Sequence, residues 1–386
     1  MIMYLTDNDL YKFTMQHAVV KLFPYAKVRY RFINRGQTKF PEGFGENLRK
    51  QIHQMADIAL TVDEKQFLAR KCYYLPPTYL DFLSGYRYDP SEVGIIQTGN
   101  EVNISIEGFW YRTILWEVPL MAMVSELYFK MTNAETWDEA KILSVAQQKA
   151  TKFNMLGINV ADFGTRRRYS FKNQDRIVNT MLTYGRPSFM GTSNVYFAMK
   201  YNLIPIGTHA HEWFMFHAAK YGFKMANKLS LENWVDVFRG DLGIALSDTF
   251  TTDVFFRSFD TKFAKLFDGV RHDSGDPIEF ADKTIAHYKS LRIDPESKTI
   301  VFSDGLDPDT VDTIVKHCRG RIKMSFGIGT NLTNDVGVKP LNIVIKITDA
   351  RPEGQDWIST VKLSDVSGKY TGDLETINLA KSILRI

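Results

Sequence analysis

The feature that most constrains the fold of this chain is a pattern that recurs seven times between residues 159 and 331. Each time, a short apolar run ends in small or acidic residues. Most intervals between these units match the length of one strand, one helix and two loops. One residue in the polar tail of each unit marks its position: Phe163, Gly191, Thr208, Asp248, Asp273, Asp304 and Gly329.

Seven such units in a row exceed what an open sheet usually contains. The pattern therefore predicts a closed or nearly closed α/β barrel. Active sites of these barrels form at the C-terminal ends of the strands, which is where every polar tail would lie. We expect residues far apart in the sequence to meet there around one cavity.

The segments on either side have a different character, and a length of 386 residues allows two or three domains. Residues 26–35 alternate apolar and charged side chains, as a half-buried strand does. A helical stretch from Phe44 and strand-like runs from Val93 and Glu101 follow, and two more alternating runs lie after Lys339. The predicted organisation is an N-terminal α+β domain over 1–122, an α/β barrel over 123–338, and C-terminal strands over 339–386 that pack on the N-terminal domain and complete it.

The composition narrows the partners and the compartment. The 48 Lys and Arg residues exceed the 44 Asp and Glu residues by only four, too few for a surface that binds nucleic acid. Cys72 and Cys318 have no CxxC partner, so we expect no disulfide framework or zinc knuckle, and a cytoplasmic location. We expect no secretory signal, because the N-terminus carries Asp7 and Asp9 and has no basic stretch followed by an apolar run. We expect no membrane association, because the most apolar stretch, from Phe109, is interrupted by Arg112 and Pro119.

A histidine motif, GTHAHE at 207–212, lies where an apolar run ends and an aromatic helix-like run begins. An imidazole in such a turn can act as a base, a metal ligand or a nucleophile. The metalloprotease motif HExxH is excluded because residue 215 is Met. Two alternatives stay open. His209 and His211 could hold a metal with nearby aspartates, as in a metal-dependent barrel hydrolase, or they could only cap the helix and fill the turn.

Three later turns combine small, hydroxyl and acidic residues: DSGD at 273–276, SDG at 303–305 and GIGTN at 327–331. Small residues let backbone N–H groups approach a phosphate, and aspartates can hold ribose hydroxyls or a hydrated Mg²⁺. Both nucleotide fingerprints, GxGxxG and GxxxxGK[ST], are absent. Each turn alone is also typical of an ordinary strand-to-helix connection, so the predicted phosphate site depends on their recurrence.

Asp-Phe-Gly at 162–164 precedes three arginines, Arg166, Arg167 and Arg168. A kinase is excluded because the HRD, APE and glycine-rich motifs are missing. An aromatic ring beside a guanidinium suits a flat heteroaromatic acid, which stacks on Phe163 and pairs its carboxylate with an arginine. The alternative is a solvated run of charge.

In chain order these motifs resemble those of one family, the nicotinate phosphoribosyltransferases of the shorter bacterial type. The resemblance covers nearly the whole chain and is carried by residues 6–15, 163–168, 191–194, 208–213, 248–250, 270–277, 303–307 and 326–332. It implies an irregular α/β barrel of the type II phosphoribosyltransferase kind, joined to the N-terminal domain.

The resemblance also implies an activity. The enzyme would join nicotinate to 5-phosphoribosyl-1-pyrophosphate (PRPP), giving nicotinate mononucleotide and pyrophosphate in NAD biosynthesis. ATP would be a co-substrate whose hydrolysis is coupled to this step, and Mg²⁺ a cofactor on the leaving pyrophosphate. The family pattern further implies a homodimer with active sites at the subunit interface.

Roles follow for individual positions by resemblance. His211 would be transiently phosphorylated by ATP, which suits the nucleophilic nitrogen of a neutral imidazole. Phe163 would stack on the pyridine ring, Arg166 would lie against its substituent, and Tyr11 of the partner subunit would complete the sandwich.

The remaining expected roles concern the sugar and its phosphates. Arg271 and Asp273 would line the ring and ribose side, and Asp248 would face PRPP. Such carboxylates stabilise the positive charge that develops on the ribose during displacement. The 5-phosphate would lie against the glycine-rich turns, with Asp304 beside it: Gly305, Gly327, Gly329 and Thr330.

Ser193 distinguishes the nicotinate enzymes from the nearest alternative family. Nicotinamide phosphoribosyltransferases resemble this family but carry an acidic residue at the place of Ser193, where it accepts a hydrogen bond from the amide. A carboxylate there would repel nicotinate, so Ser193 favours the acid. A nicotinamide enzyme is the alternative within the same class.

Overall fold

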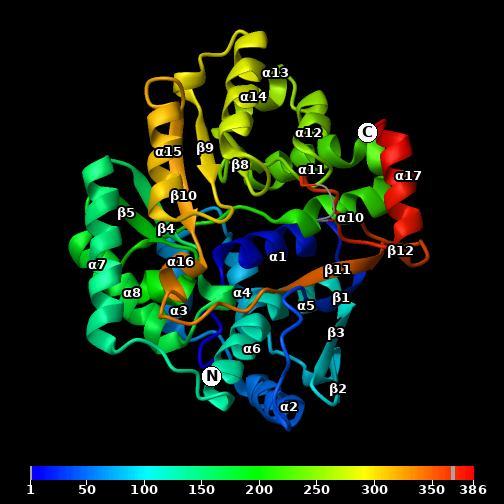
Figure 1. The fold of residues 1–386 in the computed structure, drawn as a ribbon. Helices are drawn as coiled ribbons and strands as arrows, with labels where there is room; N and C mark the ends of the chain where they lie inside the picture. Colours follow the sequence, from blue (N-terminus) through cyan, green and yellow to red (C-terminus); the bar gives the residue numbers. More distant parts are fainter. Residues whose placement is uncertain (1, 367–369) are drawn as a thin grey trace.

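The computed structural model describes residues 2–366 and 370–386, which form two sheets and the helices around them (Figure 1). The larger sheet is parallel, with the strand order β6-β5-β4-β10-β9-β8-β7. Each of the seven predicted runs forms one strand, with its marker residue in or just after it. The strands are β4 (Asn159–Asp162), β5 (Phe189–Thr192), β6 (Ile204–Pro205), β7 (Ile244–Leu246), β8 (Gly269–His272), β9 (Thr299–Phe302) and β10 (Lys323–Ile328).

The strand order is that of a barrel with one break. β10, the last of these strands in the chain, pairs in parallel with β4, the first, so the sheet curls round on itself. β6 and β7 stand at the two ends of the order and are not paired with each other. The prediction of a nearly closed, irregular α/β barrel is confirmed.

Side chains bridge this break. Thr208 Oγ1 donates a hydrogen bond to Ile244 O over 3.0 Å, and Leu246 N donates to His209 Nε2 over 3.2 Å. His209 is fully buried, and burial keeps its pKa well below the ordinary value, so its neutral ring can accept this bond. His209 thus continues the strand pairing where the backbone of β6 has ended.

Helices connect the barrel strands and cover the outside of the sheet (Figure 1). Asp276 and Asp307 each accept two backbone N–H bonds at the start of a helix that has proline at its first position, so these two acidic residues are N-caps. The helices of this part are α7 (Glu139–Leu156), α8 (Phe171–Tyr184), α9 (Val195–Lys200), α10 (His211–Tyr221), α11 (Phe223–Phe238), α12 (Thr252–Ser258), α13 (Thr261–Leu266), α14 (Pro277–Ser290), α15 (Pro308–Cys318) and α16 (Thr330–Thr333).

The second sheet has the order β12-β11-β1-β3-β2, and its neighbouring strands are antiparallel. β1 contributes alternate buried side chains, as its sequence predicts. β11, from the C-terminal part of the chain, pairs along the full length of β1, so C-terminal residues complete the N-terminal sheet as expected. The strands are β1 (Lys27–Asn34), β2 (Val93–Thr98), β3 (Glu101–Phe109), β11 (Ile343–Arg351) and β12 (Ile358–Ser359).

The N-terminal helices pack between and around the two sheets. α1 lies between the barrel strands and the antiparallel sheet in Figure 1. No helix in the two described ranges is long and apolar enough to cross a bilayer. The N-terminal helices are α1 (Leu10–Leu22), α2 (Phe44–Gln54), α3 (Val62–Lys71), α4 (Pro77–Gly85), α5 (Trp110–Thr113) and α6 (Glu117–Met131).

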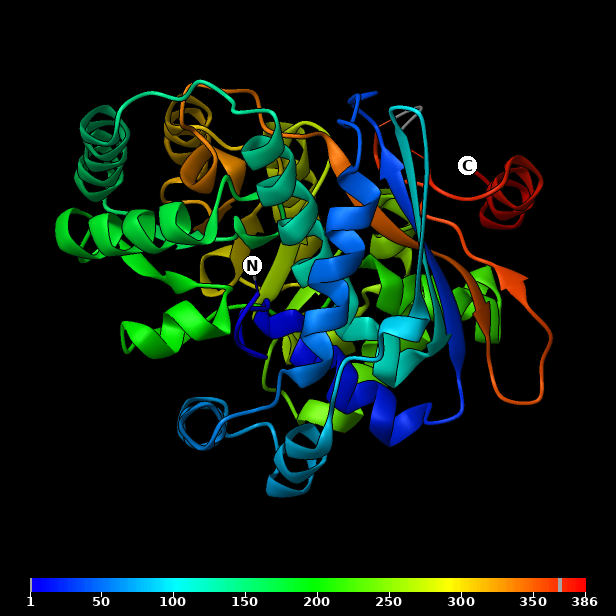
Figure 2. The same cartoon turned by 90° about the horizontal axis from the view of Figure 1, so that it is seen from below.

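The chain after β11 turns back to the barrel. β12 is shorter than the predicted strand, and beyond it Leu363 N donates to Thr249 O, next to the end of β7. The last helix, α17 (Leu374–Leu384), is tied to α12 by a bond from Arg257 to Leu384 O and lies at the periphery (Figure 2). The boundaries expected near 122 and 338 stay a prediction.

Candidate active site

A cavity of about 250 Å³ lies at the C-terminal ends of the barrel strands, with β11 forming part of its wall. Its location is that predicted for the polar tails. Most of the expected site residues line it: Tyr11, Phe163, Arg166, Ser193, His211, Arg271, Asp273, Asp304, Gly305, Gly329 and Thr330. Asp248 and Gly327 do not line the cavity and lie directly behind residues that do.

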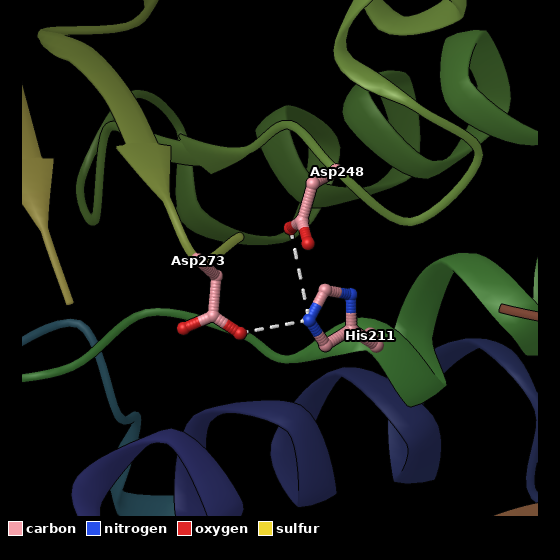
Figure 3. Close-up of side chains that lie close together, drawn as sticks. All are labelled: His211, Asp248 and Asp273. Atoms are coloured by element: carbon pink, nitrogen blue, oxygen red, sulfur yellow. Dashed lines mark hydrogen bonds and ion pairs between the residues drawn. The ribbon is translucent and has the colours of Figure 1, made fainter. Parts of the chain in front are cut away.

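His211 is the first residue of α10 and is 5% exposed. Its Nδ1 lies 2.9 Å from Thr249 Oγ1, and its Nε2 lies 2.9 Å from Asp273 Oδ2 (Figure 3). Nε2 also lies 3.7 Å from Asp248 Oδ1. Three groups that follow β7 and β8 therefore hold one imidazole ring at the edge of the cavity.

Lys362 contacts the same ring nitrogen. Its Nζ lies 2.8 Å from His211 Nε2 and 3.1 Å from Asp248 Oδ2. The two contacts of Nε2 belong to different tautomers of the neutral ring. With its proton on Nε2 the ring donates to Asp273, and with its proton on Nδ1 it donates to Thr249 Oγ1 and accepts from Lys362 at Nε2. Burial and the positive charge of Lys362 lower the pKa of His211 to about 4, so the imidazole is neutral at physiological pH.

A metal ion does not fit this cluster. One donor atom each from His211, Asp248 and Asp273 lies within 4.8 Å of the others, a spacing that a metal could bridge. However, the Lys362 ammonium bonds to His211 and Asp248, two of these three residues, and supplies positive charge where the metal would lie. His209 is bound to Leu246 N instead, so the alternative of a His209–His211 metal pair is not supported.

Phe163 and Tyr11, the two aromatic residues expected to contact the pyridine ring, both line the cavity. The Phe163 ring covers Gly327, where a Cβ would come within 2.2 Å of the ring, so Gly327 supports Phe163 from behind. Tyr11 was expected from the partner subunit, but the structure places Tyr11 of the same chain in the wall. Its hydroxyl is buried and has no hydrogen-bond partner among the residues described, which leaves it available to a ligand.

Arg166 reaches the cavity from the short 3₁₀ helix Thr165–Arg167. Its side chain is 39% exposed, and Nη1 lies 3.3 Å from Glu117 Oε1. Of the other two arginines, Arg167 also lines the cavity, and burial together with Arg166 lowers its pKa to about 10. Arg168 is buried and binds both carboxylate oxygens of Asp7, so its role is structural.

Ser193 has a partner that its sequence position did not reveal. Its Oγ donates to Asp9 Oδ1 over 2.8 Å, and Asp9 also lines the cavity. A carboxyl group therefore does lie beside the position where an acidic residue was argued to be absent. Burial raises the pKa of Asp9 to about 6, against which the nearby Arg166 acts.

Two of the glycine-rich turns line the cavity, through residues 303–305 and 329–331. Gly305 has a φ of +60°, a conformation that favours glycine, and Thr330 begins α16. Ser303 Oγ donates to Asp273 Oδ1 over 2.9 Å, which fixes the carboxylate that also meets His211. Arg271 Nε is buried without a hydrogen-bond partner in the ranges that the structure covers.

Several cationic residues of the wall were missed from the sequence. Arg35, which follows β1, Lys346 on β11, and Lys362 all lie here, beside barrel residues. Burial and Lys362 lower the pKa of Lys346 to about 8. Their only sequence signal was the alternation of charged residues along predicted strands, which is more often a solvated face.

Comparison with known proteins agrees with this arrangement. The model of the nicotinate phosphoribosyltransferase N-terminal domain matches residues 6–125, and that of the nicotinate phosphoribosyltransferase family matches residues 158–386. A nicotinate phosphoribosyltransferase of Chromohalobacter salexigens is 61% identical over 99% of this chain and 98% of its own length. One of Desulforapulum autotrophicum is 53% identical over 98% and 97%.

Solved structures give the same result. The crystal structure of nicotinate phosphoribosyltransferase from Porphyromonas gingivalis superposes with a TM-score of 0.98 and 48% identity, covering 100% of both chains. A putative nicotinate phosphoribosyltransferase of Saccharomyces cerevisiae gives 0.94 and 35%, covering 100% of this chain and 98% of the other. On this evidence the chain belongs to the nicotinate phosphoribosyltransferase family.

Proposed function

We propose that this protein joins nicotinate to PRPP, releasing nicotinate mononucleotide and pyrophosphate for NAD biosynthesis, and that a transient phosphohistidine at His211 couples the reaction to ATP hydrolysis. The observation that carries the proposal is the buried neutral imidazole of His211, which shares one cavity with the ring and guanidinium of Phe163 and Arg166. A nucleophile for phosphoryl transfer and a receptor for an aromatic acid thus face one space.

The pyridine end would bind nicotinate by stacking and charge. Phe163, supported by Gly327, offers a flat face, and the buried hydroxyl of Tyr11 offers a hydrogen bond. Arg166 would pair with the carboxylate of the ligand. For this, Arg166 has to give up part of its contact with Glu117.

Glycosyl transfer would follow in the centre of the cavity. The pyridine nitrogen attacks the anomeric carbon, the bond from that carbon to the pyrophosphate oxygen breaks, and pyrophosphate leaves. Asp273, held by Ser303, would stabilise the positive charge on the ribose. Arg35, Arg167 and Lys346 give the wall the positive charge that a pyrophosphate needs.

Mg²⁺ is expected with the substrates. Since Lys362 occupies the cluster of His211, Asp248 and Asp273, the fitting donor among the expected site residues is Asp304, which also lines the cavity and would hold the ion. Bound there, Mg²⁺ would neutralise charge on the leaving pyrophosphate.

Phosphorylation of His211 needs no added base, because the attacking nitrogen carries no proton. The Nε2 lone pair attacks the γ-phosphorus of ATP, the N–P bond forms, the bond to the bridging oxygen breaks, and ADP leaves with that oxygen. The tautomer that attacks is the one with its proton on Nδ1, where it stays bound to Thr249 Oγ1. Lys362 has to move from Nε2 to the arriving phosphoryl oxygens, while Asp248 keeps hold of it.

The direct test labels the enzyme with ATP that is radioactive in the γ-phosphate. We expect acid-labile label on the wild type and none on the His211→Ala variant, which should also lose the stimulation of nicotinate turnover by ATP. The His217→Ala variant is the control, because His217 is buried away from the cavity against Trp213. Normal stimulation in His211→Ala would overturn the phosphohistidine.

The choice of pyridine is tested separately, because Asp9 offers an acceptor for an amide. We expect faster turnover with nicotinate than with nicotinamide at equal concentration. Preference for the amide would favour the nicotinamide enzyme.

We also propose a cytoplasmic homodimer with shared sites, on the family resemblance. Two buried free cysteines, Cys72 and Cys318, suit a reducing compartment. Mixing the His211→Ala and Tyr11→Ala variants tests the sharing, with ATP-stimulated turnover of nicotinate as the readout. Mixed dimers regain this turnover if Tyr11 of the partner subunit serves the site, and they do not regain it if each chain supplies its own Tyr11.

A further inference from the structure

A buried chain of charges connects His211 with Arg166: Glu117, Glu212 and Arg166 line the cavity, and Lys12, which does not, joins the two glutamates. Lys12 on α1 is fully buried, and its Nζ lies 2.5 Å from Glu117 Oε2 and 3.0 Å from Glu212 Oε1. Glu117 also meets Arg166, at 3.3 Å through its other oxygen. Glu212 follows His211 directly on α10.

The four members carry two positive and two negative charges, and both glutamates are 6% exposed. Removing one member would leave a charge buried without its partner, which is costly. The network joins the first turns of α1, α6 and α10 to the arginine turn after β4. Lys12 and Glu212 lie in residues 6–15 and 208–213, two of the segments that carry the family resemblance, but ligand binding and catalysis as described above leave both without a role.

We propose that Lys12 is a positioning residue that couples the two ends of the cavity. Its ammonium group binds both Glu212, which follows the phosphate-accepting His211, and Glu117, which binds Arg166. The inference rests on the proposed function, because it concerns the effect of ATP on nicotinate binding. It adds a route by which phosphorylation of His211 affects the contact of Arg166 with nicotinate.

The charges give the coupling its direction. Burial and the neighbouring Glu117 raise the pKa of Glu212, although Lys12 acts against them. A phosphoryl group on His211 adds negative charge to the cavity that Glu212 also lines, and this charge favours the neutral form of Glu212, with the proton coming from water in the cavity. Lys12 then pairs with Glu117 alone. Glu117 in turn holds Arg166 less firmly, and Arg166 can meet the carboxylate of nicotinate.

The test compares the KM for nicotinate with and without ATP, at saturating PRPP. For the wild type we expect ATP to lower the KM about fivefold or more, within the usual range of coupling between sites. For Lys12→Met we expect less than about a twofold change, with the KM remaining high because Arg166 stays with Glu117, while γ-phosphate label still appears on His211. The control is Arg112→Met, which breaks another partly buried pair, with Glu92, outside the cavity and should keep the wild-type response.

Lys12→Met leaves two unpaired glutamates, so a second variant protects the fold. Lys12→Met/Glu212→Gln removes one of the two buried charges, and its thermal unfolding is measured beside the assays. A normal ATP effect on the KM in either folded variant would overturn the proposal, and so would loss of label, which would place Lys12 in phosphoryl transfer itself. Absence of label or of an ATP effect in the wild type would instead overturn the proposed function.

Discussion

Asp9 is a carboxyl group that is only 2% exposed, between Ser193 and the arginine turn. Burial raises its pKa from 3.8 to about 6, so the folded protein binds this proton more tightly than the unfolded chain does. Stability from this group is therefore fully present below about pH 4 and is lost as the pH rises to about 6. Above that pH the ionised carboxylate works against the fold.

Asp9→Asn should therefore stabilise the protein in a pH-dependent way. The amide oxygen can still accept from Ser193, and the charge is gone. We expect a gain in the free energy of unfolding of about 3 kcal/mol at pH 8, from a shift of about two pKa units, and almost none at pH 4. Urea unfolding at both values measures it, with the exposed Asp356→Asn as control. An equal effect of Asp9→Asn at the two pH values would contradict the role of ionisation.

At the scale of single elements, the break between β6 and β7 is the most informative part of the barrel. β6 has two residues and β7 three, too few to build a ladder between them. Leu246 N would be an unpaired buried donor without His209, and such a donor is costly. A histidine side chain thus performs the task of a missing strand residue.

His209→Leu keeps an apolar side chain of similar size but removes the acceptor. We expect a loss of about 1–3 kcal/mol in the free energy of unfolding, the cost of leaving Leu246 N unpaired. Urea unfolding measures it, with the exposed His53→Leu as control. Stoichiometric zinc in chelator-treated wild type that is lost in this variant would contradict the structural role and restore the metal hydrolase.

The elements also show how far sequence reasoning reaches. Each apolar run forms a strand, because the strands of a parallel sheet that is covered on both faces consist of continuous apolar residues. The polar tails lie together because parallel strands end at the same edge of the sheet. The role of His209 was not predictable, since it depends on which two strands stay apart. Asp276 looked like a ligand residue but caps α14, a distinction that composition does not make.

At the scale of the whole molecule, the cavity needs both sheets. The barrel supplies Phe163, His211 and Asp273, whereas β11 and the segment after β12 supply Lys346 and Lys362. These lysines were missed because an alternating strand usually turns its charged residues to water. Here the chain returns from the N-terminal sheet to the barrel, so that this face closes a cavity. No local pattern encodes that return.

Lys362 gives this long-range arrangement a test. Its positive charge helps to keep the pKa of His211 near 4, against the pull of Asp248 and Asp273. In Lys362→Met the two carboxylates remain while the ammonium is gone, so the pKa of His211 should rise, and more of the ring should be protonated at pH 6 than at pH 8. Histidine NMR titration measures that rise directly.

Phosphorylation follows from the same change, because a protonated imidazole has no lone pair at Nε2 for the γ-phosphorus. Labelling of Lys362→Met from ATP should therefore fall below that of the wild type at both pH values, and by a larger factor at pH 6. The matched control is Lys298→Met, whose ammonium binds Phe267 O far from His211 on the outside of the barrel. A uniform loss at both pH values, with an unchanged His211 titration, would mean that Lys362 only holds the phosphoryl oxygens. A larger loss at pH 6 would show that the returning C-terminal segment also sets the protonation state of the nucleophile.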